Sequence, residues 1–429
     1  MFTGLRFPLN LFTVLLPLTP GWFIFIILGI MKKILLLKSF NKALALSFII
    51  ILSLVLIVPV FSSCSGTATS NTFIELLNLV PADARVSSSD YPSFFTIYDY
   101  ASVFKDNGVT FSTAEELMEK YVLFKTPLQM VASGSYISGF SNKMDVTTIQ
   151  LQYMGYNASN VDAELQFGDM RNQVVVLIGR FSPQDTMNAL ENQSEWPDWA
   201  VDTYTTLEYN GVTIHSWGDG TLTHLATRLV PPHIDNLGCA KTIAVTDKYL
   251  FSGPSIEVVK YLIDASQNKV QSLADLPEYA AVADGLTSLH TYAAIIADAS
   301  LTNGCLESLE SENLDLTQEE RAAIRESMGN GLKKFLTFGS GFSVDEKSIY
   351  MSISLYHENS DLALENVSRF KYQLEHMYYI YKNKPWSNII TDSDIKADGN
   401  LLSAKLYVDS YSFWAQWVYA QDNLLFHEE

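Results

Sequence analysis

Short segments in which apolar and polar residues alternate recur after residue 160, and they constrain the fold more than any other feature of this chain. One covers Val161–Phe167, and two more cover residues 349–356 and 402–408. A strand with this period of two buries one face and leaves the other in water. Residues 174–178 form a continuous apolar run instead, which is typical of a central strand. These segments predict a fold rich in β-strands.

Turn sequences predict that neighbouring strands pair in the antiparallel sense. Asn210-Gly211 lies between the strand segments 203–209 and 212–217, and both positions of a two-residue hairpin turn favour residues that tolerate positive φ. Thr246-Asp247-Lys248 is expected to join a second pair of strands, residues 242–245 and 249–252. Gly339-Ser340-Gly341 is interpreted as a further turn because glycine commonly interrupts regular structure.

Helices are expected between these strands. Their starts are marked by side chains that can accept a hydrogen bond from the first free backbone N–H groups of a helix. These capping residues are Ser112, Ser182, Ser255 and Thr317, and residues 361–376 form a further helical segment. Together with the hairpins, the helices predict a mixed α+β fold, with mostly antiparallel sheets and helices packed on one face.

Two of the predicted helices share four consecutive residues. Ala189-Leu190-Glu191-Asn192 and Ala363-Leu364-Glu365-Asn366 each follow a predicted strand. A duplicated unit is one interpretation, and a chance match is the other. Acidic residues between positions 307 and 315 mark the one expected boundary. We therefore expect an α+β domain over residues 73–305, and either a second α+β unit or a continuation of the same domain over residues 306–429.

The N-terminal region has the layout of an export signal or an anchor helix over residues 31–63. Basic residues between positions 32 and 42 precede a run of eighteen uncharged residues, 43–60, and Phe61-Ser62-Ser63-Cys64 follows. Small residues before a cysteine resemble the lipobox of bacterial lipoproteins, although Phe61 stands where that family usually has Leu. The resemblance implies that Cys64 carries lipid and becomes the mature N-terminus. An uncleaved anchor helix is the alternative, because eighteen apolar residues nearly span a bilayer.

A second apolar segment lies at residues 1–30, where Pro17, Pro20 and Gly21 interrupt it. It is either upstream of the true start at Met31 or a transmembrane helix. In both cases the lysines between the two apolar segments lie inside, and the chain after Cys64 lies outside the cytoplasm. Residues 64–72 are small and polar, as in a tether. We expect a protein attached to the cell membrane through a lipid or an N-terminal helix.

The charge of the chain argues against nucleic acid as a partner. The first 63 residues carry five basic residues and no Asp or Glu, so the remainder has a formal net charge of −24, against −19 for the whole chain. Such a surface repels phosphate backbones and anionic lipid headgroups. Hydrophobic residues make up 48% of the chain, which is sufficient for a packed core. A protein or small-molecule partner is left open.

Three cysteines are present, and the lipobox would use one of them. Cys239 and Cys305 then remain as a pair in a compartment that permits disulfides. A disulfide between them is one expectation, and two buried thiols are the alternative.

No known nucleotide-binding, zinc-protease or nucleophile motif occurs in the sequence, and we expect no catalytic residue, no metal and no cofactor. Imidazole and carboxylate side chains between positions 215 and 235 could bind zinc or assist a nucleophile, but their spacing matches no helix face and favours structural or surface histidines. This group comprises His215, Asp219, His224, His233 and Asp235. Residues 392–399 resemble a calcium loop in their aspartates but lack the glycine of an EF-hand, which favours a solvated turn.

Several short phrases resemble a family of uncharacterised secreted or lipid-anchored bacterial proteins. The first phrase is Val80-Pro81-Ala82-Asp83, and Ile97-Tyr98-Asp99-Tyr100 follows. A strand, a turn and a helix over residues 249–264 come later, together with the phrase Ser272-Leu273-Ala274-Asp275-Leu276-Pro277-Glu278-Tyr279. The resemblance covers about residues 73–300, and it implies an α+β extracytoplasmic domain without assigned site residues.

The sequence therefore predicts a non-enzymatic extracytoplasmic lipoprotein of the bacterial cell envelope, with a binding or structural role. One alternative is the solute-binding lipoprotein of a transporter, which would need two α/β lobes with parallel sheets. The hairpin at Asn210-Gly211 counts against that architecture. The other alternative is an extracytoplasmic hydrolase that uses the region of His215, His224 and His233.

Overall fold

The computed structural model describes residues 71–85, 94–110, 154–156, 158–168, 173–192, 194, 198–218, 241–304, 317–329, 331–379, 384–409 and 423–427. The chain divides into two compact units, Met1–Ser70 and Asn71–Glu429, and every described residue belongs to the second unit. The predicted export signal or anchor therefore lies outside the described residues. Among the helices that are described, none is long and apolar enough to cross a membrane.

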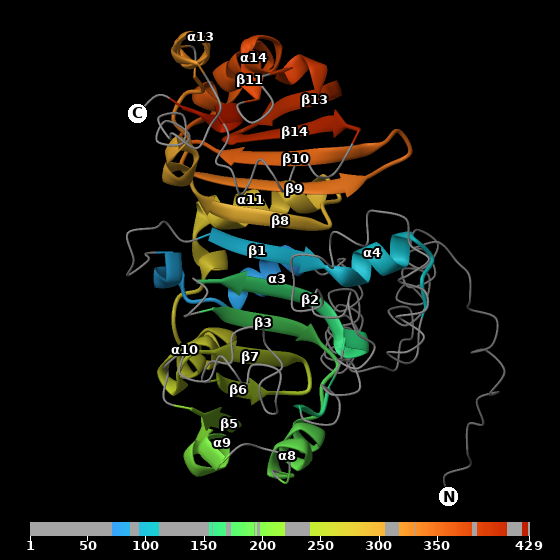
Figure 1. Ribbon diagram of the computed structural model, residues 1–429, viewed down its shortest axis with the longest axis vertical. Coiled ribbons are helices and arrows are strands. Elements are labelled where there is room, and N and C mark those ends of the chain that lie inside the picture. Colours follow the sequence, from blue (N-terminus) through green and yellow to red (C-terminus); the bar gives the residue numbers. More distant parts are fainter. Residues whose placement is uncertain are drawn as a thin grey trace, which may run out of the picture. The chain divides into compact units, whose positions relative to one another are not determined.

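The second unit is an α+β fold, which confirms the predicted fold class. Its main element is a sheet of 12 strands in the order β13-β14-β10-β9-β8-β1-β2-β3-β7-β6-β5-β4, in which neighbours pair in the antiparallel sense (Figure 1). The strands are Phe94–Asp99 (β1), Val161–Phe167 (β2), Val174–Gly179 (β3), Thr205–Tyr209 (β4), Val212–Trp217 (β5), Lys241–Val245 (β6), Tyr249–Gly253 (β7), Ala293–Asp298 (β8), Thr337–Val344 (β9), Ile349–Tyr356 (β10), Ile390–Asp398 (β13) and Leu401–Val408 (β14). A separate pair consists of Tyr378–Tyr379 (β11) and Lys384–Pro385 (β12).

Helices begin where the capping residues predicted them. The side chains of Ser182, Ser255 and Thr317 each accept a hydrogen bond from a backbone N–H group in the first turn that follows. Ser112 lies outside the described residues. The α-helices are Thr72–Asn78 (α3), Tyr100–Asp106 (α4), Pro183–Glu191 (α8), Asp198–Thr203 (α9), Ile256–Ser266 (α10), Pro277–Ser288 (α11), Gln318–Met328 (α13) and Ser360–His376 (α14). Short 3-10 helices include Ala82–Arg85 (η2), Leu273–Asp275 (η6), Ala299–Gly304 (η7) and Asn423–Leu425 (η10).

The strand order repeats on the two sides of the boundary between β1 and β8. From that boundary outward, the first half reads β1-β2-β3-β7-β6 and the second half reads β8-β9-β10-β14-β13. In each half a helix follows the third strand, α8 after β3 and α14 after β10, and the chain then returns through a hairpin, β6–β7 or β13–β14. Strands β4 and β5 extend the first half only. The sheet therefore consists of two similar α+β arrangements, and the second begins at β8.

The four residues shared by the two helices do not account for this repeat. They lie in equivalent helices, but Ala189 is near the end of α8 whereas Ala363 is in the first turn of α14. The repeated arrangement of strands is therefore the stronger sign of two related units, and the four-residue match is out of register with it.

The sheet has two differently covered faces. Helices α3, α10 and α11 pack on one face, which we call the helical face. Strand β3 is buried on both faces: Val174 and Val176 contact the core under these helices, and Val175 and Leu177 contact the core on the opposite face. The continuous apolar run in the sequence predicted this central position. In β14, by contrast, Leu402, Ala404 and Leu406 are buried and the intervening residues are partly exposed.

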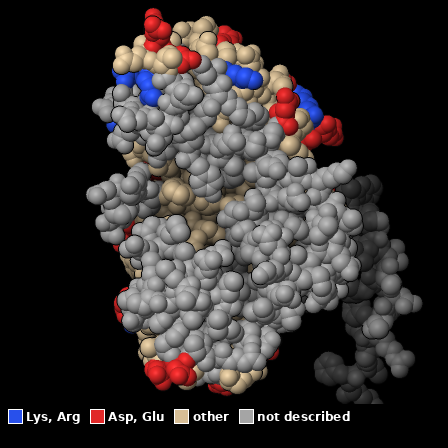
Figure 2. Space-filling model, viewed as in Figure 1, with Lys and Arg blue, Asp and Glu red and all other residues tan. Residues whose placement is uncertain are grey.

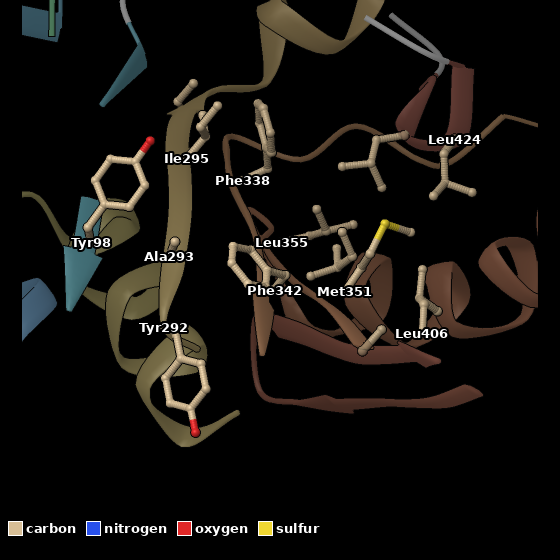
Figure 3. Packing of buried hydrophobic residues seen from close by; sticks show 14 of the residues in the cluster. Tyr98, Tyr292, Ala293, Ile295, Phe338, Phe342, Met351, Leu355, Leu406 and Leu424 are labelled. Atoms are coloured by element: carbon tan, nitrogen blue, oxygen red, sulfur yellow. The ribbon is translucent and has the colours of Figure 1, made fainter. Parts of the chain in front are cut away.

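The opposite face of the second half is closed by aromatic and aliphatic side chains. Phe338 and Phe342 of β9 lie between residues of β8, such as Ile295, and residues of β10, such as Met351 (Figure 3). Helix α14 packs against β13 and β14 and adds Phe370 to this core. Burial of such side chains is the main stabilising contribution to the unit.

The interpretation of Gly339-Ser340-Gly341 as a turn is wrong, because all three residues lie within β9. Helix α11 crosses β9 so closely that a Cβ atom on Gly339 would lie 2.7 Å from side-chain atoms of Val282 and Leu286. A Cβ atom on Gly341 would lie 2.3 Å from the carbonyl oxygen of Ala293. Gly339 therefore permits a close approach of α11 to β9, and Gly341 permits a close approach of β8. Sequence alone does not distinguish such glycines from those of a turn.

Candidate functional site

His215 is the one member of the predicted histidine group that the structure describes. It lies in β5 with 3% of its surface exposed, and its Nδ1 atom is 2.9 Å from the hydroxyl oxygen of Tyr204. The ring of Tyr204 also stacks on the imidazole. Burial lowers the pKa of His215, although the negative charge of Glu208 opposes this effect. A buried imidazole with these contacts has the properties of a structural histidine.

The other predicted site residues lie outside the described part of the chain. For Cys64, Cys239 and Cys305, the lipid and the disulfide therefore stay predictions. The remainder of the histidine group is not described either; it comprises Asp219, His224, His233 and Asp235. Among the described residues, no group of three or more His, Cys, Asp or Glu side chains could hold a metal ion.

The interpretation of residues 392–399 as a solvated turn is wrong for most of the segment. Residues up to Asp398 form the edge strand β13, and the turn is confined to the hairpin that follows. Same-face neighbours along a strand lie about 7 Å apart, so their carboxylates do not converge as cation ligands do. Asp392 is instead paired with Lys347, whose Nζ atom lies 3.1 Å from Oδ2 of the aspartate.

A fully buried carboxylate, Glu164, lies near the middle of the sheet on the opposite face of β2. The hydroxyl group of Tyr100 donates a hydrogen bond of 2.6 Å to Oε2, and the amide of Gln166 donates to Oε1. The alternation in this segment predicted that its polar residues face water, which is wrong for Glu164. Both carboxylate oxygens receive donors, which offsets much of the cost of removing the group from water.

The end of β1 holds a second buried carboxylate, Asp99. Burial raises its pKa, and the hydrogen bonds that it accepts from the backbone and hydroxyl group of Ser102 oppose this effect. These bonds also cap the N-terminus of α4. Asp162 lies close by. Burial raises its pKa as well, against the opposing charge of Arg180, and the charge of Asp99 raises it further.

Tyrosine hydroxyls satisfy carboxylates throughout the described part of the chain. The whole sequence has 47 acidic residues but 28 basic residues, so many carboxylates have no basic residue to pair with. A hydroxyl group can satisfy such an oxygen without adding charge. Seven such bonds have lengths between 2.6 and 3.0 Å, and they join Tyr100 to Glu164, Tyr209 to Asp264, Tyr249 to Glu75, Tyr261 to Asp83, Tyr279 to Asp298, Tyr292 to Asp106 and Tyr407 to Asp345.

Two of the phrases that carry the family resemblance come together in the structure. Pro81 and Ser272 form a β-bridge, the backbone N–H of Leu273 donates to the carbonyl of Val80, and that of Ala82 donates to the carbonyl of Gln271. Residues 80–83 and 271–275 thus form one joint between η2 and η6. Its contacts include these backbone hydrogen bonds, which hold the two segments together.

Helix α3, which begins the second unit, is attached to the rest of the unit at both ends. At its start, Asn71 donates to Asp284 over 2.6 Å and accepts from the hydroxyl group of Thr287 over 2.7 Å. In its middle, Glu75 pairs with Lys248 and accepts from the hydroxyl group of Tyr249. The η2–η6 joint follows its end. These contacts join the start of the second unit to α11 and to the start of β7.

The second half contains a buried histidine, His357, at the end of β10. Its Nδ1 atom is 3.2 Å from the carbonyl oxygen of Asn400, and its Nε2 atom is 2.8 Å from the amide nitrogen of Asn366. These partners fit a neutral ring in which Nδ1 donates and Nε2 accepts. Asn366 also bonds both backbone groups of Lys333. Burial lowers the pKa of His357 to about 4, so the ring is neutral at physiological pH.

The comparisons with known proteins add little to this geometry. The chain matches no protein-family model and no curated protein sequence. Three solved structures, crystal forms I, III and IV of a protein named TP0453, resemble it weakly, with TM-scores of 0.32, 0.32 and 0.31 and sequence identities of 10%, 11% and 10%. The alignments cover 76% to 79% of this chain and 92% to 97% of TP0453. Similarity at this level supports no inference about function.

Proposed function

We propose that this chain is a membrane-attached component of the bacterial cell envelope, and that its second unit lies outside the cytoplasm and acts by binding or as a structural part. The proposed location rests on the sequence, where a segment with the layout of an export signal ends at Cys64. The division of the chain into two compact units between Ser70 and Asn71 agrees with a folded part that follows an attachment segment.

The observation that carries the proposed role is that buried polar side chains bond to other side chains of the same unit. Glu164 is bonded to Tyr100, His215 to Tyr204, and His357 to Asn366. A catalytic acid, base or nucleophile must instead be directed at a bound substrate. In the described part of the chain these groups join one element to another. Their arrangement suits a rigid scaffold.

The two alternatives receive less support. A transporter's solute-binding protein would need two lobes with parallel sheets, whereas 12 of the strands described here form one antiparallel sheet that extends across both halves. A hydrolase based on the histidine group would need the imidazole of His215 to reach a substrate, and only 3% of the surface of His215 is exposed.

The experiment that tests the proposed attachment uses the full chain in a bacterial host. Membranes are separated from the soluble fraction, and the mature N-terminus is analysed by mass spectrometry. We expect a peptide that begins at an acylated Cys64, an uncleaved signal in Cys64→Ala, and normal processing in the matched control Cys239→Ala. An unmodified Cys64 within an intact 43–60 segment would replace the lipid with an anchor helix. Recovery of the second unit in the cytoplasm would contradict the proposal.

A separate measurement tests the non-catalytic role. Elemental analysis of the purified full chain should find no stoichiometric zinc. One zinc per chain that is lost in His215→Ala would favour the hydrolase instead.

A further inference from the structure

The sheet ends in two edge strands of different character. β13 carries four charged residues, Asp392, Asp394, Lys396 and Asp398, and a register shift near its start. Charges and bulges of this kind prevent an edge from pairing with another chain. β4 has the sequence Thr-Thr-Leu-Glu-Tyr, pairs with β5 in regular register and carries one charge, on Glu208. Within the described residues, the edge at β4 therefore lacks the charges and the bulge that protect the edge at β13.

The hairpin register shows which backbone groups of β4 point outward. Asn210 and Gly211 form a two-residue turn with positive φ at both positions, so Tyr209 and Val212 are a hydrogen-bonded pair. Hydrogen-bonded pairs alternate with non-bonded pairs along an antiparallel ladder. The N–H and C=O groups of Thr206 and Glu208 therefore point away from β5. No hydrogen bond to them occurs within the described part of the chain.

Side-chain contacts hold this hairpin in place. At the turn, Tyr209 and Asn210 each donate to a carboxylate oxygen of Asp264 on α10 over 2.8 Å. Just before the strand, Tyr204 bonds and stacks on His215 of β5. The edge is thus fixed before any partner arrives, which lowers the entropic cost of adding a strand.

We propose that β4 pairs in the antiparallel sense with β4 of a second copy of this chain, around a two-fold axis at Leu207. In that register Thr206 and Glu208 of one copy form hydrogen-bonded pairs with Glu208 and Thr206 of the other. All the outward backbone groups of both strands are then satisfied by four hydrogen bonds. The two sheets become one continuous sheet, and the interface is isologous, as in most homodimers.

The side chains fit the same register. Leu207, which is 38% exposed, lies opposite its own copy in a non-bonded pair, where side chains approach most closely. Thr206 lies opposite Glu208, so the two negative charges are not placed against each other. The same two-fold pairing of β13 around Ile395 would set Asp394 against Lys396, which is favourable, but Asp392 against Asp398, which is unfavourable. The pairing of β4 contains no such pair of like charges.

Longer-range charge opposes the contact. In the view of Figure 2, the charged side chains coloured at the end of the unit that carries α8 and α9 are acidic. These helices contribute Asp185, Glu191, Asp198 and Asp202, and β4 follows directly. Like charges on two copies repel each other, and salt screens this repulsion. Dimer formation should therefore strengthen as ionic strength rises.

Disulfide trapping of the full chain, purified in detergent, tests the register. A residue on the two-fold axis faces its own copy, so Leu207→Cys should yield a covalent dimer on mild oxidation. The matched control is Thr205→Cys, another exposed residue of β4, which lies opposite Tyr209 of the second copy and should cross-link no more than the unsubstituted chain. Addition of Thr206→Pro to Leu207→Cys removes an outward N–H group and leaves the ladder with β5 intact, and it should abolish the cross-link.

Three results would overturn the proposal. The first is the absence of a covalent dimer from Leu207→Cys at high salt and high protein concentration. The second is equal cross-linking of Thr205→Cys. The third is a cross-link of Leu207→Cys that survives the addition of Thr206→Pro. Circular dichroism of each variant verifies that the sheet has formed, so that a misfolded variant is not counted.

Discussion

The two halves of the sheet have the same strand order but different covers. In the first half, β7 leads into α10, which packs on the helical face of β5, β6 and β7. In the second half the corresponding strands β14 and β13 present partly or fully exposed polar residues on that face, such as Ser403, Lys405 and Asp394. The difference follows from composition: an apolar face requires a helix over it, and a polar face is stable in water.

The first prediction tests whether α10 stabilises the first half by covering its apolar face. Ile263 of α10 is fully buried against the helical face of the first half. Replacement by Ala leaves a cavity and should lower the free energy of unfolding by about 2–5 kcal/mol. The control is Leu364→Ala on α14, where the leucine is 66% exposed, and its effect should be within about 0.5 kcal/mol. Chemical denaturation measures both, and equal effects would show that α10 is not an essential cover.

The second prediction concerns a polar contact of the second half and its pH dependence. Burial lowers the pKa of His357 to about 4, from an ordinary value of 6.5. The unfolded chain therefore binds a proton first as the pH falls. The contribution of His357 to stability is complete above about pH 6.5 and is lost as the pH falls from 6.5 to 4, by up to about 3 kcal/mol.

Denaturant unfolding measured at several pH values tests this expectation. His357→Gln should reduce the slope of the curve between pH 6.5 and 4 even if the variant is less stable at every pH. A smaller slope should remain from His215, whose pKa is also lowered by burial. His376→Ala, which removes an exposed histidine of the same half, should retain the slope. A slope in His357→Gln that equals that of the unsubstituted chain would assign the pH dependence to other groups.

The hydrophobic pattern predicted which faces of the strands are buried, and the capping residues predicted where helices begin. Both signals failed where a tertiary contact decides the environment of a residue. The continuous run in β3 and the alternation in β14 gave their burial correctly, because each reflects the number of apolar faces. Glu164 and Gly339 were misinterpreted. The first is buried because Tyr100 and Gln166 reach it, and the second lies in a strand because α11 crosses there. Neither contact has a signature in the local sequence.

The candidate site was predictable to a smaller extent than the fold. The sequence identified carboxylates and histidines but not the tyrosines that satisfy them. Tyr279 and Asp298 are 19 positions apart, and Tyr249 and Glu75 are 174 apart. A composition with more acidic than basic residues is the one sequence signal for such pairs. It indicates that other donors are needed and does not show which tyrosines supply them.

The third prediction tests whether such tyrosines stabilise the first half. Tyr100→Phe removes one donor to the buried carboxylate of Glu164 while the ring remains. An under-satisfied buried carboxylate should cost about 1–3 kcal/mol of the free energy of unfolding. Tyr261→Phe, at an exposed tyrosine that donates to Asp83, should cost less than about 0.5 kcal/mol. If Tyr100→Phe is neutral in denaturation, the Tyr100 bond contributes no net stability.

The smallest expected effect compares two lysines of the second half. The ammonium group of Lys405 lies 4.1 Å above the ring centre of Tyr350 and 3.1 Å from Oδ2 of Asp345, and its side chain is 20% exposed. Loss of a partly buried cation over an aromatic ring should cost about 1 kcal/mol in Lys405→Ala. Lys347 makes a similar pair with Asp392, but both side chains are more than half exposed. Lys347 also lies over an aromatic ring, 4.9 Å from the ring centre of Tyr407. Water and salt screen these exposed contacts, so Lys347→Ala should lower the free energy of unfolding less than Lys405→Ala does. Measurement at low and high salt sharpens the contrast, because the cost of Lys405→Ala should persist where the exposed pair has none. If Lys347→Ala proves the more costly change, the polar face of β13 and β14 depends on its exposed ion pairs for stability. In that case these ion pairs would take the place of a covering helix.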